Sequence, residues 1–197
     1  MLVLVLGLVL FLGTHAFTML RGPRERLIAR IGEGPYKIGY SLLAAAGLVV
    51  IGLGYGQYRA NGMIELWSPP LWTRHLALLL TLLAFICLAA AYLPGRIKGR
   101  LKHPMLAGVK IWASAHLLAN GDLGSILLFG GFLAWAVAAR ISAKRRDVAK
   151  PHSGPAAAPA GWRNDALAVG VGVAAWLVFA RVLHPWLIGV PVWPGQA

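Results

Sequence analysis

The chain has 197 residues, of which 58% are hydrophobic and 13% are charged, and its formal net charge is +13. A charged fraction about half that of soluble domains excludes an ordinary soluble enzyme and indicates an integral membrane protein. The basic residues stand in short clusters between apolar runs, as in the loops of membrane proteins, which argues against nucleic acid as a partner.

The apolar runs predict an all-α fold, a polytopic helical bundle that forms one domain over residues 1–197. The expected transmembrane spans are residues 1–18, 38–55, 71–93, 104–119, 123–139 and 166–183, six in all. The first run has no basic residue before its apolar part, so we expect a retained span and not a signal peptide. The fourth span is short, which favours a tilted helix or one that is partly buried in protein. Residues 150–161 are rich in Pro and Ala and predict a flexible linker.

The basic clusters alternate between successive loops. They follow the first, third and fifth spans, whereas the opposite loops and the last span carry only Arg59, Arg74 and Arg181. By the positive-inside rule, the three basic loops are cytoplasmic and both termini lie on the outer, periplasmic side.

Two histidines fall inside the predicted spans, where ionisable groups are costly and mark candidate sites. His116 shares one helix face with Gly108, Trp112 and Asn120 because they are spaced four residues apart. The small Gly108 would leave room for a flat ligand. His103 lies roughly 140° away around the same helix, so one helix cannot aim both histidines at one atom. A second metal ligand must come from elsewhere, and His15 is the best candidate, although an ordinary hydrogen-bonded histidine explains it equally well.

Polar residues beside His116 allow more than one role. Asn120, Asp122 or a backbone carbonyl could accept the second ring N–H of a ligating His116. Asn-Gly-Asp at residues 120–122 also fits a tight turn, and the two roles are compatible. His103 precedes Pro104 and suits a helix entry or a contact to an anionic group. Lys110 would either extend toward the cytoplasmic interface or face an anionic ligand.

The sequence offers few ligands for other cofactors. The single cysteine, Cys87, excludes a disulfide framework and iron–sulfur clusters, and carboxylates are scarce. Imidazole remains as the metal-binding group, and in a membrane-embedded helical bundle it favours haem.

The stretch HPMLAGVKIWASAHLLANGDLGSILLFG, residues 103–130, together with His15, Phe17 and Arg21, resembles the NnrU family of bacterial membrane proteins. Members of that family are associated with denitrification and nitric oxide metabolism. The family is in turn similar to zeta-carotene isomerase, a membrane enzyme in which two histidines hold haem b for redox-dependent cis–trans isomerisation. The resemblance implies a multi-pass protein of the bacterial inner membrane, and the similar pattern of spans covers most of the chain.

The resemblance implies haem b as the cofactor, with His15 and His116 as its axial ligands. Gly108 and Trp112 would line the ring, with Asn120 and Asp122 near His116. Arg21 or Arg24 would neutralise the propionates, and His103 is a propionate contact or an alternative ligand. This chain has Ala113 where the isomerase has Cys and Ser114 where it has Leu. Haem ligation is therefore a firmer implication than isomerase chemistry.

Three functions follow as hypotheses. The first is a haem b protein with a redox-linked role that handles nitric oxide or a small apolar polyene, with other membrane redox proteins as partners. It would be an enzyme if it isomerises the polyene. The second is a cofactor-free assembly or partner factor for a nitric oxide reductase system. The third is a small transporter that couples Lys110 with Asp122.

Overall fold

The computed structural model describes residues 1–149 and 161–193, and nearly all of the predicted linker at 150–161 lies outside these ranges. The regular structure of the described residues is helical, with one isolated β-bridge between Glu65 and Asp122. The elements are α1 (Leu2–Phe17), α2 (Arg21–Ile31), α3 (Glu33–Ala60), α4 (Leu71–Tyr92), α5 (Arg96–Leu101), α6 (Pro104–Ala119), α7 (Leu123–Ala149), α8 (Trp162–Val178), the π-helix η1 (Phe179–Leu183) and α9 (His184–Ile188).

The all-α prediction is confirmed, but the count of six spans is only partly supported. Four stretches of the described residues are long and apolar enough to cross a membrane, and the bent pair of α1 and α2 makes a fifth candidate. The helices α1 and α6 have 16 residues each. A helix of that length covers about 24 Å, which is less than the apolar core of a bilayer.

The predicted boundaries of the fourth span agree with α6, because Pro104 occupies its first turn and Asn120 ends it. Several other helices are longer than predicted, since their charged ends continue the helix beyond the apolar run. The second predicted span, 38–55, becomes the helix α3 with 28 residues. The basic loop expected after α1 contains α2, which turns by 87° from α1.

The helices α1 and α3 form a close hairpin that depends on glycine. A Cβ atom added to Gly7 would lie 2.6 Å from the backbone nitrogen of Ile51, and one added to Gly47 would lie 2.8 Å from that of Phe11. A Cβ atom on Gly54 would collide with the backbone of Leu4. Small residues let helix backbones approach closely in lipid, where packing must replace the hydrophobic effect. The hairpin places the C-terminal turns of α1 beside α3.

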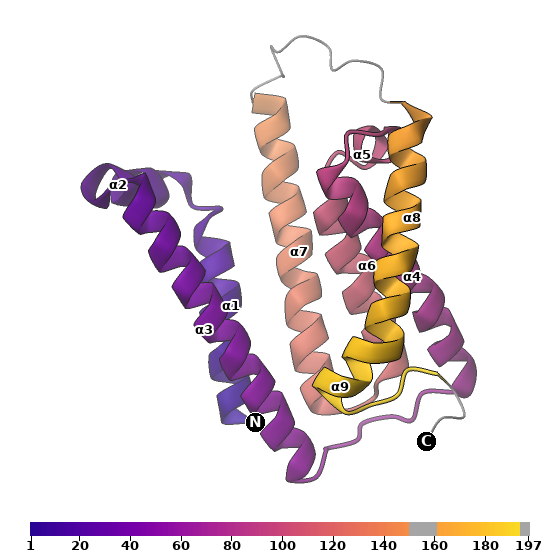
Figure 1. Cartoon of the computed structure of the whole chain (residues 1–197). Helices are drawn as coiled ribbons and strands as arrows, with labels where there is room; N and C mark the ends of the chain where they lie inside the picture. Colours follow the sequence, from indigo (N-terminus) through magenta and orange to yellow (C-terminus); the bar gives the residue numbers. More distant parts are fainter. Residues whose placement is uncertain (150–160, 194–197) are drawn as a thin grey trace.

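The remaining long helices, α4, α6, α7 and α8, form a bundle beside this hairpin (Figure 1). Gly108 of α6 faces α4, where an added Cβ would lie 3.0 Å from the carbonyl oxygen of Ala84. The indole N–H of Trp176 on α8 donates a hydrogen bond of 3.1 Å to the Thr81 hydroxyl of α4. Many large apolar side chains on the outside of both parts stay exposed, as expected for surfaces that face lipid.

The hairpin and the bundle are tied together at one end. The hydroxyl groups of Tyr55 on α3 and Ser125 on α7 lie 2.7 Å apart, and Ser125 is fully buried. The loop before α4 also binds the turn before α7, because Leu66 N–H donates to the Gly121 carbonyl at 2.9 Å. Toward the other end the hairpin and α7 diverge, so the two parts form a V that is closed below α9 and open beside α2 (Figure 1).

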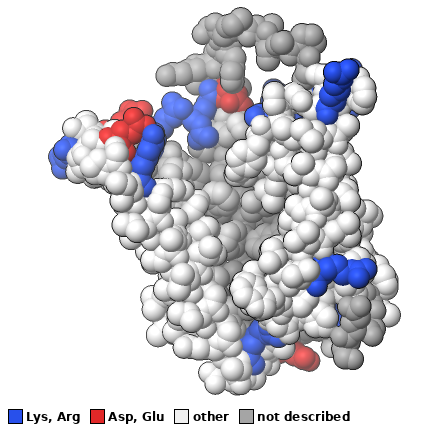
Figure 2. Space-filling model, in the orientation of Figure 1, with Lys and Arg blue, Asp and Glu red and all other residues white. Residues whose placement is uncertain are grey.

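The open end of the V is also the more basic one. We call it the basic end and define it by α2, α5 and the C-terminal turns of α7. Most of the Lys and Arg side chains visible in Figure 2 lie there, and the same face is hollowed along its middle between the hairpin and the C-terminal helices. The start of α1 and the helix α9 lie together at the opposite end (Figure 1).

Candidate functional site

His15 lies near the C-terminal end of α1 inside a group of aromatic rings. Its Nδ1 is 2.8 Å from the carbonyl oxygen of Phe11, one turn earlier. Since a carbonyl oxygen only accepts, Nδ1 carries the proton and the Nε2 lone pair of the neutral ring is left for another partner. Phe11 stacks on the imidazole at 4.2 Å between ring centroids, while Tyr40 of α3 and Trp135 of α7 lie at 5.4 and 5.5 Å.

His116 on α6 has the same local geometry in a second aromatic group. Its Nδ1 lies 2.8 Å from the Trp112 carbonyl oxygen, so Nδ1 donates and Nε2 is again the free nitrogen. Phe129 of α7 stacks on the ring at 4.4 Å and Trp112 lies at 5.1 Å. Of the three acceptors that the sequence allowed for the ring N–H of His116, the structure therefore selects the backbone carbonyl.

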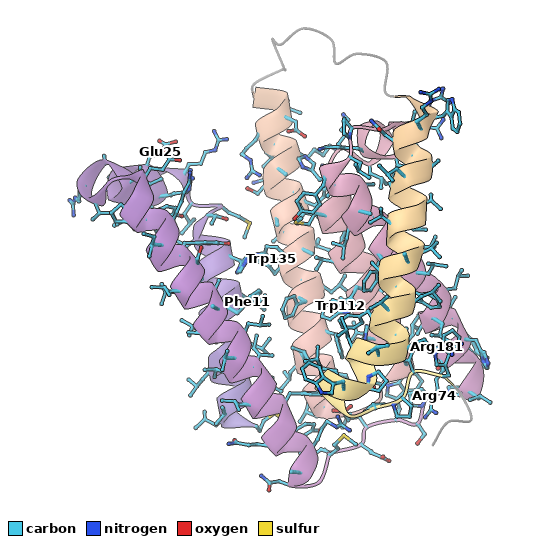
Figure 3. The ribbon with its side chains drawn as sticks, in the orientation of Figure 1. Phe11, Glu25, Arg74, Trp112, Trp135 and Arg181 are labelled. Atoms are coloured by element: carbon cyan, nitrogen blue, oxygen red, sulfur yellow. The ribbon has the colours of Figure 1, made fainter. Side chains whose placement is uncertain are left out.

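Three aromatic rings connect the two histidine groups. Phe132 of α7 lies 5.4 Å from Phe11 and 5.4 Å from Trp112, and Figure 3 shows Phe11 between the hairpin and α7. Because Phe11 and Trp112 contact the same ring, they lie at a similar level. His15 is one turn nearer the basic end and His116 one turn nearer the opposite end, which separates them by about 11 Å along the bundle.

The surroundings of His15 contain an unpaired donor. The Nε1 atom of Trp135 is buried and has no hydrogen-bond partner among the described residues. A buried donor without an acceptor costs roughly 1–3 kcal/mol, so such groups normally have a partner or a functional reason. An acceptor bound beside His15 would satisfy this N–H.

A cavity of about 520 Å³ opens one turn beyond His15 and Trp135, toward the basic end. Met19 and Arg21 line it from the junction of α1 and α2, and Ala138, Ile141, Ser142, Arg145 and Arg146 line it from α7. The open end of the V thus combines positive charge with apolar surface about one helical turn from His15.

The other residues on the His116 face have structural partners. Gly108 packs against α4, so the space expected beside it is filled by that helix. Asn120 donates from its side-chain amide to the His116 carbonyl at 2.8 Å and ends α6. Asp122 is buried and accepts the Ser125 N–H at 2.9 Å, which is an N-cap contact for α7. The Asn-Gly-Asp stretch therefore forms the turn at the closed end of the V.

The remaining candidates lie apart from both imidazoles. The guanidinium of Arg24 is 5.4 Å from the centre of the Tyr36 ring. His103 Nε2 lies 2.9 Å from an Asp147 carboxylate oxygen, which joins the start of α6 to α7. Lys110 lines a separate cavity of about 420 Å³ with apolar side chains and Ser114. The ion pairs of the described residues are His103–Asp147 and Lys37–Glu33, so the Lys110–Asp122 pair of the transporter hypothesis is not formed there.

The His103–Asp147 pair is partly exposed, and we expect its contribution to stability to be small. The side chains of the two residues are 28% and 29% exposed. Replacing His103 by Ala should lower the free energy of unfolding by less than about 1 kcal/mol, the usual range for accessible ion pairs. Chemical unfolding of the purified protein in detergent measures this. A loss several times larger would show that the pair holds α6 against α7.

Sequence reasoning missed several residues of the His15 group. Tyr40 and Trp135 contact the imidazole, and Arg145 and Arg146 line the cavity next to it. The position of Trp135 gave no signal, because it lies one turn before the end of the predicted span 123–139, where membrane tryptophans gather. No local pattern could assign the two arginines, since their contacts depend on how α1 and α7 diverge.

Within the described ranges, no group of three or more His, Cys, Asp or Glu residues could hold a metal ion. A closed structural zinc site needs four such ligands. The Nε2 atoms of His15 on α1 and His116 on α6 are the imidazole nitrogens of this region that could ligate a metal ion or a haem iron.

A family model described as NnrU protein matches residues 3–192 of the chain. The match takes in all ten described helical elements from Val3 onward, including both histidine groups and the cavity at the basic end. No curated protein and no solved structure matches the chain.

Proposed function

The chain belongs to the NnrU family, and from the histidines of α1 and α6 we propose that it is a membrane protein that binds haem b. One observation carries the proposal. His15 and His116 each donate Nδ1–H to the carbonyl one turn earlier, which leaves Nε2 of the neutral imidazole available as a metal ligand. Histidines that ligate metals use this arrangement, because the hydrogen bond fixes the tautomer and orients the ring.

The surroundings of His15 support a bound group better than those of His116. Trp135 offers a buried N–H without an acceptor, and Arg21 lies in the cavity one turn away. His116 has the same donor chemistry, and Phe129 stacks on its ring as Phe11 does on that of His15. Since the two imidazoles lie at different levels, ligation of one iron by both requires α1 and α6 to shift relative to each other.

Haem would supply one-electron redox chemistry at this site. In our proposal, His15 Nε2 binds the iron and Phe11 keeps the imidazole in place by stacking on it. Trp135 donates its N–H to an acceptor beside His15, and Arg21 or Arg24 balances the negative charge of propionates. The aromatic rings around both histidines exclude water. The resemblance supports a redox-linked role in nitric oxide metabolism and denitrification, or in polyene isomerisation.

A cofactor-free role as an assembly partner of a nitric oxide reductase system is the second candidate. It is favoured by the region around His116, where Asn120, Asp122 and Gly108 all have structural partners. Under this hypothesis, replacing both His15 and His116 would leave the activity of the partner complex unchanged.

The first test is the absorption spectrum of the purified protein, oxidised and reduced, before and after incubation with haemin. The proposal predicts an intense Soret band with the sharp visible bands of low-spin haem. Absence of any such band after reconstitution would refute haem binding and favour the partner role.

A further inference from the structure

The cavity at the mouth of the V is lined by residues of two chemical kinds, and each side of the cavity supplies both. Arg21, Arg145 and Arg146 bring three guanidinium groups to it. Met19, Ala138 and Ile141 supply apolar surface. The cavity lies between two separate parts of the fold, α7 and the junction of α1 and α2, so a ligand there would contact both.

Among the described residues, Arg21, Arg145 and Arg146 form no ion pair. Within the described residues the carboxylates that form ion pairs are Glu33, with Lys37, and Asp147, with His103. Arg146 donates a hydrogen bond of 2.9 Å to the Ser142 hydroxyl, one turn earlier on α7. This contact holds the guanidinium along the wall of the cavity, but it adds no negative charge.

Guanidinium groups bind carboxylates and phosphates in a planar, two-pronged geometry. Three of them around one space repel each other, and an anion between them removes that repulsion. A free ion would leave the apolar residues of the cavity uncovered, whereas an acyl chain or ring attached to the anion would cover them.

We propose that this cavity binds an anionic amphiphile, with its oxyanion group on Arg21, Arg145 and Arg146. The apolar body then lies against Met19, Ala138 and Ile141, between the hairpin and α7. Two sources supply this chemistry, an acidic phospholipid of the surrounding bilayer and the propionates of haem. The inference rests on the cavity and does not require haem, since a protein without haem still binds the phospholipid.

The test compares two charge-matched double variants. Arg145→Gln with Arg146→Gln removes two cavity groups, and Arg96→Gln with Arg100→Gln removes the same charge from exposed positions on α5 at the same end. Each protein is purified in a neutral detergent and titrated with phosphatidylglycerol, phosphatidylcholine or haemin. Native mass spectrometry measures bound lipid, and absorption measures bound haem. The single variant Arg21→Gln repeats the test from the other wall if the first double variant fails to fold.

We expect binding of phosphatidylglycerol to weaken at least about tenfold in the cavity variant and to be unchanged in the α5 variant. Weaker haemin binding in the cavity variant, with phosphatidylglycerol unchanged, would identify propionates as the source. Equal binding of both ligands by the two variants would overturn the inference, as would displacement of phosphatidylglycerol by millimolar inorganic phosphate. If the protein takes up no haem, the proposed function is refuted. If the cavity variant of that protein still binds phosphatidylglycerol more weakly than the original chain does, this inference is supported.

Discussion

Replacing His15 by Ala should abolish the haem absorption bands, whereas replacing His75 by Ala should leave them unchanged. The Nδ1 atom of His15 is held by the Phe11 carbonyl, which leaves Nε2 for the iron, and loss of the imidazole removes this ligand. His75 is exposed on α4 and makes a matched control for loss of a histidine. Difference spectra of the reduced and oxidised proteins measure the result.

Two further measurements separate ligation from folding. Free imidazole added to a His15→Gly variant should restore the bands, because it can occupy the space of the missing ring. Circular dichroism should show the same helix content in every variant. Bands that persist in the His15→Ala protein would refute ligation by this residue.

The His116→Ala variant distinguishes two arrangements of the same site. If its bands are lost as well, both imidazoles hold one iron, and α1 and α6 must shift relative to each other to bring them together. If only the His15 variant loses the bands, the iron has one protein ligand and an open position for a small molecule such as nitric oxide. Loss in a His103→Ala variant would assign the second ligand to that residue and would require its pair with Asp147 to break.

The second large effect concerns the glycine face of α3. Replacing Gly54 by Leu should destabilise the protein by roughly 2–3 kcal/mol or separate the hairpin, because overpacking forces neighbours apart. The new side chain would collide with the backbone of Leu4, which cannot move aside as a flexible side chain can. Thermal unfolding in detergent, followed by tryptophan fluorescence, measures the loss.

Gly52→Leu is the matched control on the same helix. Nothing lies within 4 Å of a Cβ atom placed on Gly52, so its new side chain would face open space or lipid. Leucine also has a higher helix propensity than glycine by up to about 1 kcal/mol, so this variant should be neutral or slightly more stable. Equal destabilisation by both variants would contradict the proposed packing of α1 on α3.

The packing of α1 also controls the His15 group. Gly47 faces the backbone of Phe11, the ring that stacks on His15. A larger residue at Gly47 would therefore displace both rings, and haem binding should weaken together with stability. The aromatic group around His15 thus depends on a glycine that carries no chemistry of its own.

Local sequence patterns located the apolar helices but not all of their ends. The bounds of α6 were predicted because Pro104 marks its first turn and a turn sequence follows Ala119. Helices with charged ends were predicted too short, since apolar runs report the lipid-exposed part of a helix and not its full length. The helix α2 was read as a loop because its sequence is basic and not apolar.

The candidate site was predictable only in part. The sequence singled out His15 and His116 because histidines are unusual inside apolar spans. It assigned ligand-lining roles to Gly108, Asn120 and Asp122, which the fold uses for helix packing and for the turn before α7. The sequence around these residues looks the same whether they line a ligand or serve helix packing and a turn.

By itself, the sequence determined the class of protein, the positions of its apolar helices and the two histidines worth testing. Those features depend on composition and on spacing within one helix. Only the tertiary structure decided that the hairpin and the bundle meet at one end and diverge at the other. That divergence sets the levels of His15 and His116 and creates the arginine-lined cavity. The closed end results from contacts between residues far apart in the chain, such as Tyr55 and Ser125, and these contacts leave no signal until the partner helix is known.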